Sequence, residues 1–289
     1  MPTIATSLRF SHRATNGIRL HVAEAGPEDG RVVLLLHGFP EFWYGWRHQI
    51  GALAEAGYRV VAPDQRGYNL SDRPHGIAAY DIDALARDIL GLAAGLGREK
   101  LVLVGHDWGA AVAWWIASHH SDRLERFVAL AAPHPAVWMA AIRNNPAQRK
   151  KSWYVKALRL PWLPELLLRQ GNFKALAHAL GGAQRADACS AADLETYRAA
   201  WATPGALTAM VNWYRAFQRR RWNLDDQRRI KAPGLVIWGN HDRYGVRALA
   251  ESSVALCEHA SAVYLDASHW VQHDEPERVN GLLLEFLRD

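Results

Sequence analysis

The feature that most restricts the fold of this 289-residue chain is a regular alternation of apolar, strand-length runs with helix-length segments. Continuous apolar runs are typical of strands that are buried on both faces of a parallel sheet. The pattern predicts an α/β fold: an eight-stranded, mostly parallel sheet with helices on both faces. We expect strands at 7–12, 18–25, 31–38, 59–64, 101–106, 126–132, 234–239 and 262–267, and helices at about 43–56, 80–96, 108–120, 246–259 and 275–288. The short turn RATNG predicts that the first two strands form an antiparallel hairpin at the sheet edge.

The alternation stops between residues 134 and 230. This stretch contains prolines at 146, 161, 164 and 204 and several amphipathic segments but no convincing strand, and it is too long for a loop without structure of its own. It predicts a helical cap inserted after the sixth strand. The chain would then divide into a core (1–133), a cap (134–230) and the rest of the core (231–289). Open parallel sheets bind ligands beyond the carboxyl ends of their strands, so a cap leaving from one such end would cover that site.

The motif GHDWG, residues 105–109, joins an expected strand to an expected helix and has the form of a nucleophile elbow. The central position of such elbows is commonly serine, and here it is Asp107. A helix N-cap would explain an aspartate at this position, but an N-cap does not need glycine on both sides. We therefore interpret Asp107 as a carboxylate nucleophile.

A nucleophile elbow requires an orienting acid and a histidine, in that order along the chain. Asp242 follows the strand expected at 234–239, and His269 follows the strand expected at 262–267, so both would reach the same sheet edge. The competing acids are Asp64 and Asp266, and the competing histidines are His106, His241, His259 and His273.

The loop HGFPE follows the third strand, where one backbone N–H of an oxyanion hole is expected. That donor would be Phe39, and the second would be Trp108, the residue after the nucleophile. Pro40 is a candidate for a cis peptide bond. A carboxylate nucleophile attacks an sp3 carbon that carries a good leaving group or belongs to a strained ring. His269 would then activate the water that hydrolyses the resulting ester.

Composition excludes several other classes. Only two cysteines are present, Cys189 and Cys257, and their spacing argues against a disulfide framework and a structural zinc site. No signal-peptide pattern and no 18-residue apolar run occur, so we expect a cytoplasmic protein without a membrane partner. The net charge is +5, and we interpret the arginines as scattered over solvated helix faces. We expect no metal, no cofactor and no nucleic acid partner, and a homodimer is left open.

The motifs HGFPE, GHDWG, NHD and SHW together resemble the α/β-hydrolase fold superfamily, in its epoxide hydrolase and haloalkane dehalogenase branch. The resemblance covers nearly the whole chain. It implies an epoxide hydrolase in which Asp107 opens the ring, and His269 with Asp242 hydrolyses the alkyl-enzyme ester to a vicinal diol. The partners would then be a small-molecule epoxide and water.

The resemblance also implies that two cap tyrosines hold and protonate the epoxide oxygen. NWYRAF resembles the family's second tyrosine motif and nominates Tyr214, whereas SWYVKALRLPWLPE resembles the region of the first and nominates Tyr154. Tyr197 is the third tyrosine of the cap. The segment KALRL, 156–160, is more basic than we expect beside this motif. A tyrosine stays protonated at neutral pH and can therefore donate to a developing alkoxide.

The alternative is a haloalkane dehalogenase, which would use the same Asp107, Asp242 and His269 and could hold halide with the Trp108 indole. Haloalkane dehalogenases usually carry asparagine after HG, where this chain has Phe39. Fluoroacetate dehalogenases place arginines just after the nucleophile, which this chain lacks, and Asp107 excludes serine-dependent esterases. A binding protein without catalysis is a third hypothesis, against which the intact set of candidate residues argues.

Overall fold

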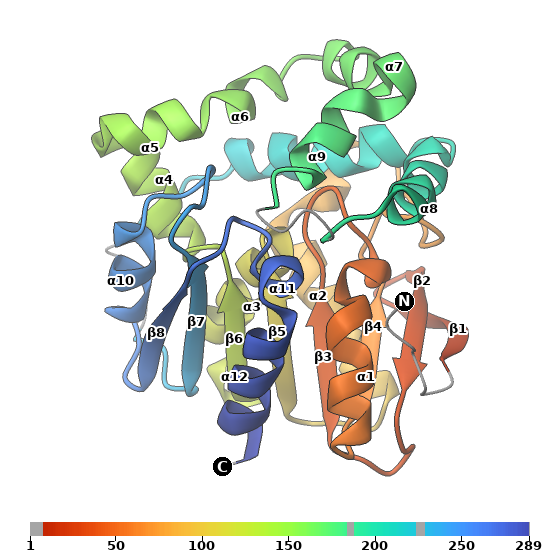
Figure 1. Ribbon diagram of the computed structural model, residues 1–289, viewed down its shortest axis with the longest axis vertical. Helices are drawn as coiled ribbons and strands as arrows, with labels where there is room; N and C mark the ends of the chain where they lie inside the picture. The colour runs from red at the N-terminus through yellow and green to blue at the C-terminus, as the bar shows by residue number, and fades with distance from the viewer. Residues whose placement is uncertain (1–7, 184–187, 224–228, 289) are drawn as a thin grey trace.

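The computed structural model describes residues 8–183, 188–223 and 229–288. Its centre is an eight-stranded sheet in the order β1-β2-β4-β3-β5-β6-β7-β8 (Figure 1). The strands are β1 (Arg9–Thr15), β2 (Ile18–Ala25), β3 (Val32–Leu36), β4 (Arg59–Pro63), β5 (Leu101–His106), β6 (Leu124–Leu130), β7 (Gly234–Gly239) and β8 (Ala260–Leu265). β1 and β2 form the expected hairpin, β2 pairs antiparallel with β4, and all other pairs are parallel. The predicted α/β fold is confirmed. Residue 7, the expected start of the first strand, lies outside the described residues.

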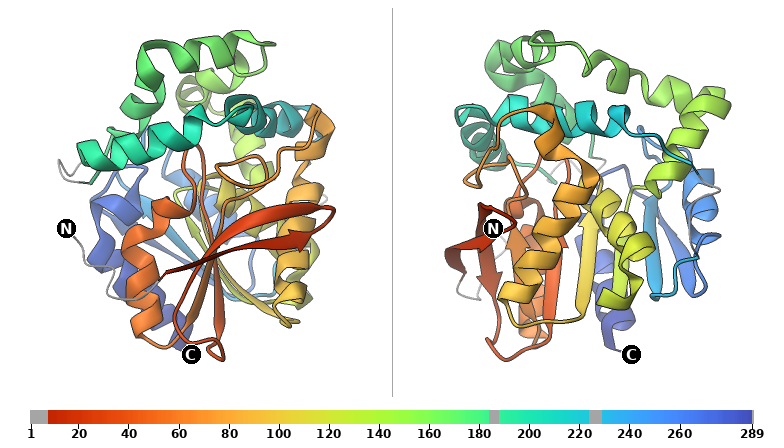
Figure 2. Two further views of the ribbon diagram at one scale, coloured as in Figure 1. Left: turned by 90° about the vertical axis from the view of Figure 1, so that its right-hand side faces the viewer. Right: turned by 180° about the vertical axis from the view of Figure 1, so that it is seen from behind.

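Helices cover both faces of the sheet, because the central strands are almost entirely apolar and must be buried on both faces. Every residue of β3, β5 and β7 is buried. On one face, η1 (Trp43–Trp46), α1 (Arg47–Glu55), α11 (Val271–Asp274) and α12 (Pro276–Arg288) enclose one apolar core. On the other face lie η2 (Ile77–Tyr80), α2 (Ile82–Gly95), α3 (Trp108–His119), η3 (Ser121–Arg123) and α10 (Ala248–Val254). Figure 2 shows these two layers from the side and from behind.

The expected helix at 246–259 is too long. α10 ends at Val254, and residues 256–258 instead pair with the segment before β7: Ile230 donates to the Leu256 carbonyl and Glu258 donates to the Ile230 carbonyl. This long-range pairing satisfies backbone groups that a longer helix would have paired internally.

Between β6 and β7 the described residues form helices and no strand. These are α4 (Pro135–Asn144), α5 (Pro146–Lys151), α6 (Trp153–Ala157), α7 (Leu163–Leu180), α8 (Ala191–Ala202) and α9 (Ala206–Arg219). We call these helices and their connections the cap. The cap lies over the carboxyl ends of the parallel strands (Figure 1). The boundaries of a separate cap domain at 134 and 230 stay a prediction.

Three tryptophan indoles connect the cap to the core. Trp201 of α8 donates to the Pro40 carbonyl at 2.6 Å, and Trp213 of α9 donates to the Arg66 carbonyl at 3.0 Å. Trp270, at the start of α11, donates in the opposite direction to the Ala179 carbonyl in α7 at 2.9 Å. These bonds fix the cap above the loops that follow the strands. None of the helices in the described part of the chain is both long and apolar enough to cross a bilayer.

Candidate active site

Asp107 occupies a strained turn between β5 and α3. Its backbone adopts φ 50° and ψ −117°, a conformation that residues other than glycine rarely adopt. The flanking glycines make this turn possible. A Cβ at Gly109 would lie 2.0 Å from the Leu36 carbonyl oxygen, and one at Gly105 would lie 2.4 Å from the Gly109 carbonyl oxygen. The motif GHDWG therefore forms a sharp elbow that lifts the Asp107 side chain above the sheet.

The Asp107 carboxylate has two distinct oxygens. Oδ1 accepts a 2.8 Å hydrogen bond from the backbone N–H of Phe39, and Oδ2 lies 3.6 Å from His269 Nε2. Burial raises the pKa of Asp107, but the His269 ring and the Phe39 N–H outweigh burial and lower it overall. Asp107 is therefore ionised at neutral pH, and its side chain is 21 % exposed, toward the cavity described below.

His269 connects Asp107 to Asp242. Its Nδ1 lies 2.8 Å from Asp242 Oδ2, and Asp242 Oδ1 accepts the backbone N–H groups of Tyr244 and Gly245. Burial lowers the pKa of His269, but Asp242 and then Asp107 outweigh it and raise the pKa to about 10. In this state the histidine is an imidazolium between two carboxylates.

Both competing acids and two of the competing histidines, His241 and His259, lie away from Asp107. Asp64 pairs with His21 and accepts the Trp43 N–H, so it fixes loops behind the site. Asp266 pairs with His241 at the exposed surface. His259 is exposed, and its backbone carbonyl accepts a hydrogen bond from the Gly234 N–H.

Both nominated tyrosines line the same cavity as Asp107 and His269. This cavity has a volume of about 930 Å³, and most of the side chains around it are apolar. The rings of Tyr154 and Tyr214 meet edge to face at 6.1 Å. Burial first, and then the negative charge of Asp107, raises the pKa of Tyr154 well above its usual value, so its hydroxyl stays protonated. The pKa of Tyr214 is also raised well above its usual value, by burial, by Tyr154 and by Asp107.

Trp108 and Phe39 lie next to Asp107, and their roles as oxyanion-hole donors stay a prediction. Trp108 is the first residue of α3, where a backbone N–H has no acceptor within the helix. Its indole ring packs edge to face on Tyr214 at 4.9 Å, and Phe39 packs on the same tyrosine at 5.3 Å. The peptide bond between Phe39 and Pro40 is cis.

Comparisons with known proteins agree with this geometry. A family model described as alpha/beta hydrolase fold matches residues 31–276. The AB hydrolase superfamily protein YfhM of Bacillus subtilis is 47% identical, over 95% of this chain and 96% of that protein. Epoxide hydrolase A of Mycobacterium tuberculosis is 35% identical, over 94% of this chain and 95% of that protein. A crystal structure of Bacillus megaterium epoxide hydrolase in complex with an inhibitor is 31% identical with a TM-score of 0.88, covering 96% of this chain and 100% of that one.

The chain belongs to the epoxide hydrolase family of the α/β hydrolases.

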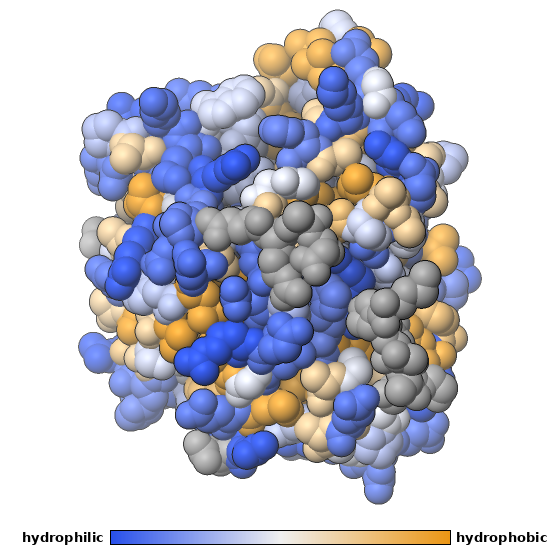
Figure 3. Space-filling view, viewed as in Figure 1, coloured by the Kyte–Doolittle hydropathy of each residue, from blue (hydrophilic) through white to orange (hydrophobic). Residues whose placement is uncertain are grey.

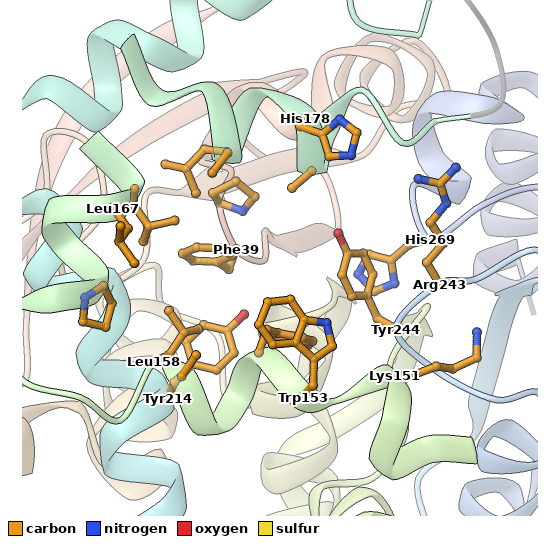
Figure 4. A pocket seen from close by; sticks show the side chains of 18 of the residues that line it. Phe39, Lys151, Trp153, Leu158, Leu167, His178, Tyr214, Arg243, Tyr244 and His269 are labelled. Atoms are coloured by element: carbon orange, nitrogen blue, oxygen red, sulfur yellow. The ribbon is translucent and has the colours of Figure 1, made fainter. Parts of the chain in front are cut away.

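The cavity of this hydrolase is asymmetric. Figure 4 shows Leu158, Leu167 and Phe39 toward one side of it, and Lys151 and Arg243 toward the other. The Lys151 ammonium donates to the Asp242 backbone carbonyl at 2.6 Å, so a residue of the cap also contacts the segment that carries the candidate acid.

Tyr244 is a site residue that the sequence did not nominate. Its ring lines the cavity and packs edge to face on His269 at 4.8 Å. Figure 4 shows Tyr244 beside His269 and Tyr214 across the cavity. Tyr244 follows Asp242 by two residues, and this closeness to the candidate acid is the signal that could have identified it.

A buried carboxylate behind the site was also missed. Glu41 accepts hydrogen bonds from Tyr197 (2.6 Å), His273 (2.8 Å) and Gln272 (3.1 Å). His106 lies between this carboxylate and the site, with Nδ1 3.5 Å from Glu41 and Nε2 3.0 Å from the His269 carbonyl oxygen. Burial raises the pKa of Glu41, but His273 and His106 outweigh it and lower the pKa well below its usual value. His106 thus supports the backbone of His269, whereas His273 binds the carboxylate behind it.

Proposed function

We propose that this hydrolase opens epoxides through a covalent ester on Asp107 and then hydrolyses that ester to a vicinal diol. The observation that carries the proposal is the presence of two tyrosines, the buried Tyr214 and the partly buried Tyr154, in the same apolar cavity as an ionised carboxylate on a sharp elbow. When an epoxide opens, its oxygen becomes an alkoxide that must take a proton, so hydroxyl donors are needed. A halide leaves as a stable anion and does not need two such donors. The named activity of the relatives supports the same reaction.

In the first step, Asp107 Oδ2 attacks one epoxide carbon, and the C–O bond of the ring breaks. Oδ1 stays at the Phe39 N–H, which orients the attacking carboxylate. The electron pair of the broken bond goes to the ring oxygen, which takes a proton from Tyr154 or Tyr214. The raised pKa values of these tyrosines keep the proton available at neutral pH.

In the second step, water attacks the carbonyl carbon of the Asp107 ester and gives a proton to His269. The negative charge of the free Asp107 contributes to the raised pKa of His269, and that charge disappears when the ester forms. The pKa of His269 must then fall, so the imidazolium gives up its proton, which restores the tyrosine that was deprotonated in the first step, and the neutral histidine can act as a base. The charge that develops on Oδ1 is held by the Phe39 N–H and, we propose, by the Trp108 N–H. When this intermediate collapses, the bond between the Asp107 carbonyl carbon and the substrate oxygen breaks, and the departing alkoxide takes the proton of the new Asp107 hydroxyl. This releases the diol and restores Asp107 as a carboxylate beside a protonated His269.

The test compares the wild type with Asp107→Ala on racemic styrene oxide and on 1-bromobutane, with diol and bromide measured as products. Asp266→Ala is the matched control, because Asp266 is an exposed aspartate whose partner is His241. We expect diol from the wild type and the control, and none from Asp107→Ala. Bromide without diol would assign the chain to the dehalogenases, and diol from Asp107→Ala would refute the proposed nucleophile.

A further inference from the structure

The outer edge of the cap exposes an unusual amount of apolar surface. Seven large hydrophobic residues are exposed in the described part of the chain, and five of them lie between residues 153 and 167. Monomeric proteins rarely expose contiguous apolar surface without a binding role. These five residues, with exposed fractions of 48 to 70 %, are Trp153, Leu160, Trp162, Leu166 and Leu167. We call them the cap patch.

The cap patch is not needed to pack the cap onto the core. The same segment has an inward face of its own, formed by Val155, Leu158 and Pro164, which are buried. Leu166 donates its N–H to the Trp162 carbonyl, so these two residues lie one helical turn apart on the outward side. The segment is therefore apolar on two sides, and only one of them is covered by the protein.

The positive charge of the molecule is concentrated beside the cap patch. Residues 149–174 contain seven lysines and arginines and one acid, a net charge of +6, whereas the whole chain carries +5. The single acid, Glu165, turns inward and pairs with the buried Arg215 at 2.7 Å. The expectation of scattered arginines did not consider the lysines, which supply four of the seven cations in this segment. The exposed cations are Arg149, Lys150, Lys156, Arg159, Arg169 and Lys174.

Three residues of the cap patch also border the cavity. Trp153, Leu160 and Leu167 are exposed and at the same time line the cavity that contains Asp107. Figure 3 shows hydrophobic residues over α7 at the top of the molecule, with hydrophilic residues beside them. A surface that pressed against this edge would face the cavity entrance directly.

We propose that the cap patch and its cations dock the protein on an anionic lipid surface, so that lipophilic substrates enter the cavity from the lipid. Tryptophan and leucine are the residues that insert at the boundary of headgroups and acyl chains, and lysine and arginine bind anionic headgroups. The binding itself does not depend on the proposed reaction. It departs from the expectation of no membrane partner, which rested on the lack of a spanning segment.

Two other occupants fit less well. A second copy of this chain would bring two surfaces of +6 together, and like charges across an interface are unfavourable. Single-stranded nucleic acid would use the cations and tryptophans, but it gives no role to three exposed leucines.

The experiment measures binding of the full chain to vesicles of pure phosphatidylcholine and to vesicles that contain phosphatidylglycerol, by co-sedimentation at low and high salt. We expect binding only to the phosphatidylglycerol vesicles, and weaker binding as salt screens the charges. The triple variant Lys156→Glu, Arg159→Glu, Arg169→Glu should bind roughly a hundredfold more weakly. The double variant Trp162→Ala, Leu166→Ala should bind the phosphatidylglycerol vesicles about tenfold more weakly or worse, since it removes apolar surface that would insert into the lipid.

Matched controls separate this surface from general effects of charge and hydrophobicity. Lys231→Glu, Arg278→Glu, Arg288→Glu makes the same charge change at exposed positions outside the cap. Phe10→Ala, Leu70→Ala removes side chains that are 52 % and 55 % exposed on the core. Both controls should bind clearly better than the corresponding cap variants. Trp162 and Leu166 do not line the cavity, so their double variant should keep wild-type turnover of a water-soluble epoxide.

Several results would overturn the proposal. If folded wild-type protein does not bind phosphatidylglycerol vesicles at low salt, lipid docking is refuted. A dimer that the Trp162→Ala, Leu166→Ala variant dissociates, seen by light scattering without lipid, would assign the patch to contacts between copies. Oligonucleotide binding that the triple variant abolishes, without vesicle binding, would assign it to nucleic acid. Vesicle binding without epoxide turnover would refute the proposed function and leave the docking surface in place.

Discussion

At the residue scale, the charge of His269 is coupled to the chemical state of Asp107. The two side chains approach to 3.6 Å, and the ionised carboxylate contributes to a His269 pKa of about 10. An imidazolium cannot accept a proton from water, so the free protein holds its histidine inactive as a base. The ester that we propose on Asp107 would remove one of the two negative charges that raise the pKa of His269.

This coupling predicts the behaviour of His269→Gln. The variant keeps the nucleophile and the tyrosines but lacks the base, so ring opening should proceed and the ester should persist. Mass spectrometry after incubation with an epoxide should show an adduct on the peptide that contains Asp107. The double variant Asp107→Ala, His269→Gln should show none. Normal steady-state turnover by His269→Gln would mean that another group activates the water.

The tyrosines predict a graded effect. Tyr154→Phe or Tyr214→Phe should each slow ring opening by about 10- to 100-fold, because one hydroxyl remains. The double variant lacks both hydroxyls, so its rate of ring opening should fall much further. Single-turnover kinetics would measure this step. Tyr197→Phe is the matched control, since its hydroxyl binds Glu41 and its ring does not line the main cavity. If Tyr197→Phe proves to be the variant that slows ring opening most, the assignment of the two tyrosines is wrong.

At the element scale, the elbow depends on how closely α3 can approach β3 and β5. Gly109→Ala would place a Cβ 2.0 Å from the Leu36 carbonyl oxygen, which only a shift of the backbone can relieve. We expect a loss of more than about 3 kcal/mol in the free energy of unfolding, or failure to fold. Urea denaturation would measure the loss.

Gly281→Ala provides the control for that substitution. Gly281 lies within α12, and a Cβ there would meet no atom within 4 Å. Alanine is the better helix former by roughly 0.5–1 kcal/mol, so this variant should gain stability. If both variants lost equal stability, the close approach of α3 to the Leu36 carbonyl would not be the cause of the loss in Gly109→Ala.

The elements and the elbow could be predicted from sequence because they rest on local patterns. Eight strands, the hairpin and the turn at Asp107 each have a signature within ten or twenty residues. The pairing of residues 256–258 with Ile230 does not, and this is why α10 was expected to be longer. Glu41 could not be identified either, because its partners Tyr197 and His273 come from the cap and from α11. Only the folded chain brings these three together.

At the scale of the whole molecule, the ion pairs of His269 predict how stability depends on pH. The pKa of His269 rises from 6.5 in the unfolded chain to about 10 in the folded chain, so protonation favours the fold. This contribution is fully present below pH 6.5 and is lost as the pH rises toward 10. The free energy of unfolding should therefore fall across this window by roughly 3–6 kcal/mol more in the wild type than in His269→Gln.

Chemical denaturation of both proteins at several pH values would measure this difference. His241→Gln is the control, because His241 pairs with Asp266 at the exposed surface, where such pairs contribute little. Parallel stability curves for the wild type and His269→Gln between pH 6.5 and 10 would contradict a raised pKa in the folded protein.

The three indole bonds between cap and core have a consequence for the evolution of such enzymes. Trp201, Trp213 and Trp270 all donate to backbone carbonyls, which every residue type supplies. The attachment of the cap is thus insensitive to most substitutions at the accepting positions. The outer edge at 153–167 makes none of these three indole bonds. Mutations there can therefore change the shape of the cavity while Asp107, His269 and Asp242 keep their positions. Enzymes that share this scaffold can therefore change the substrates that they accept without changes to their catalytic residues.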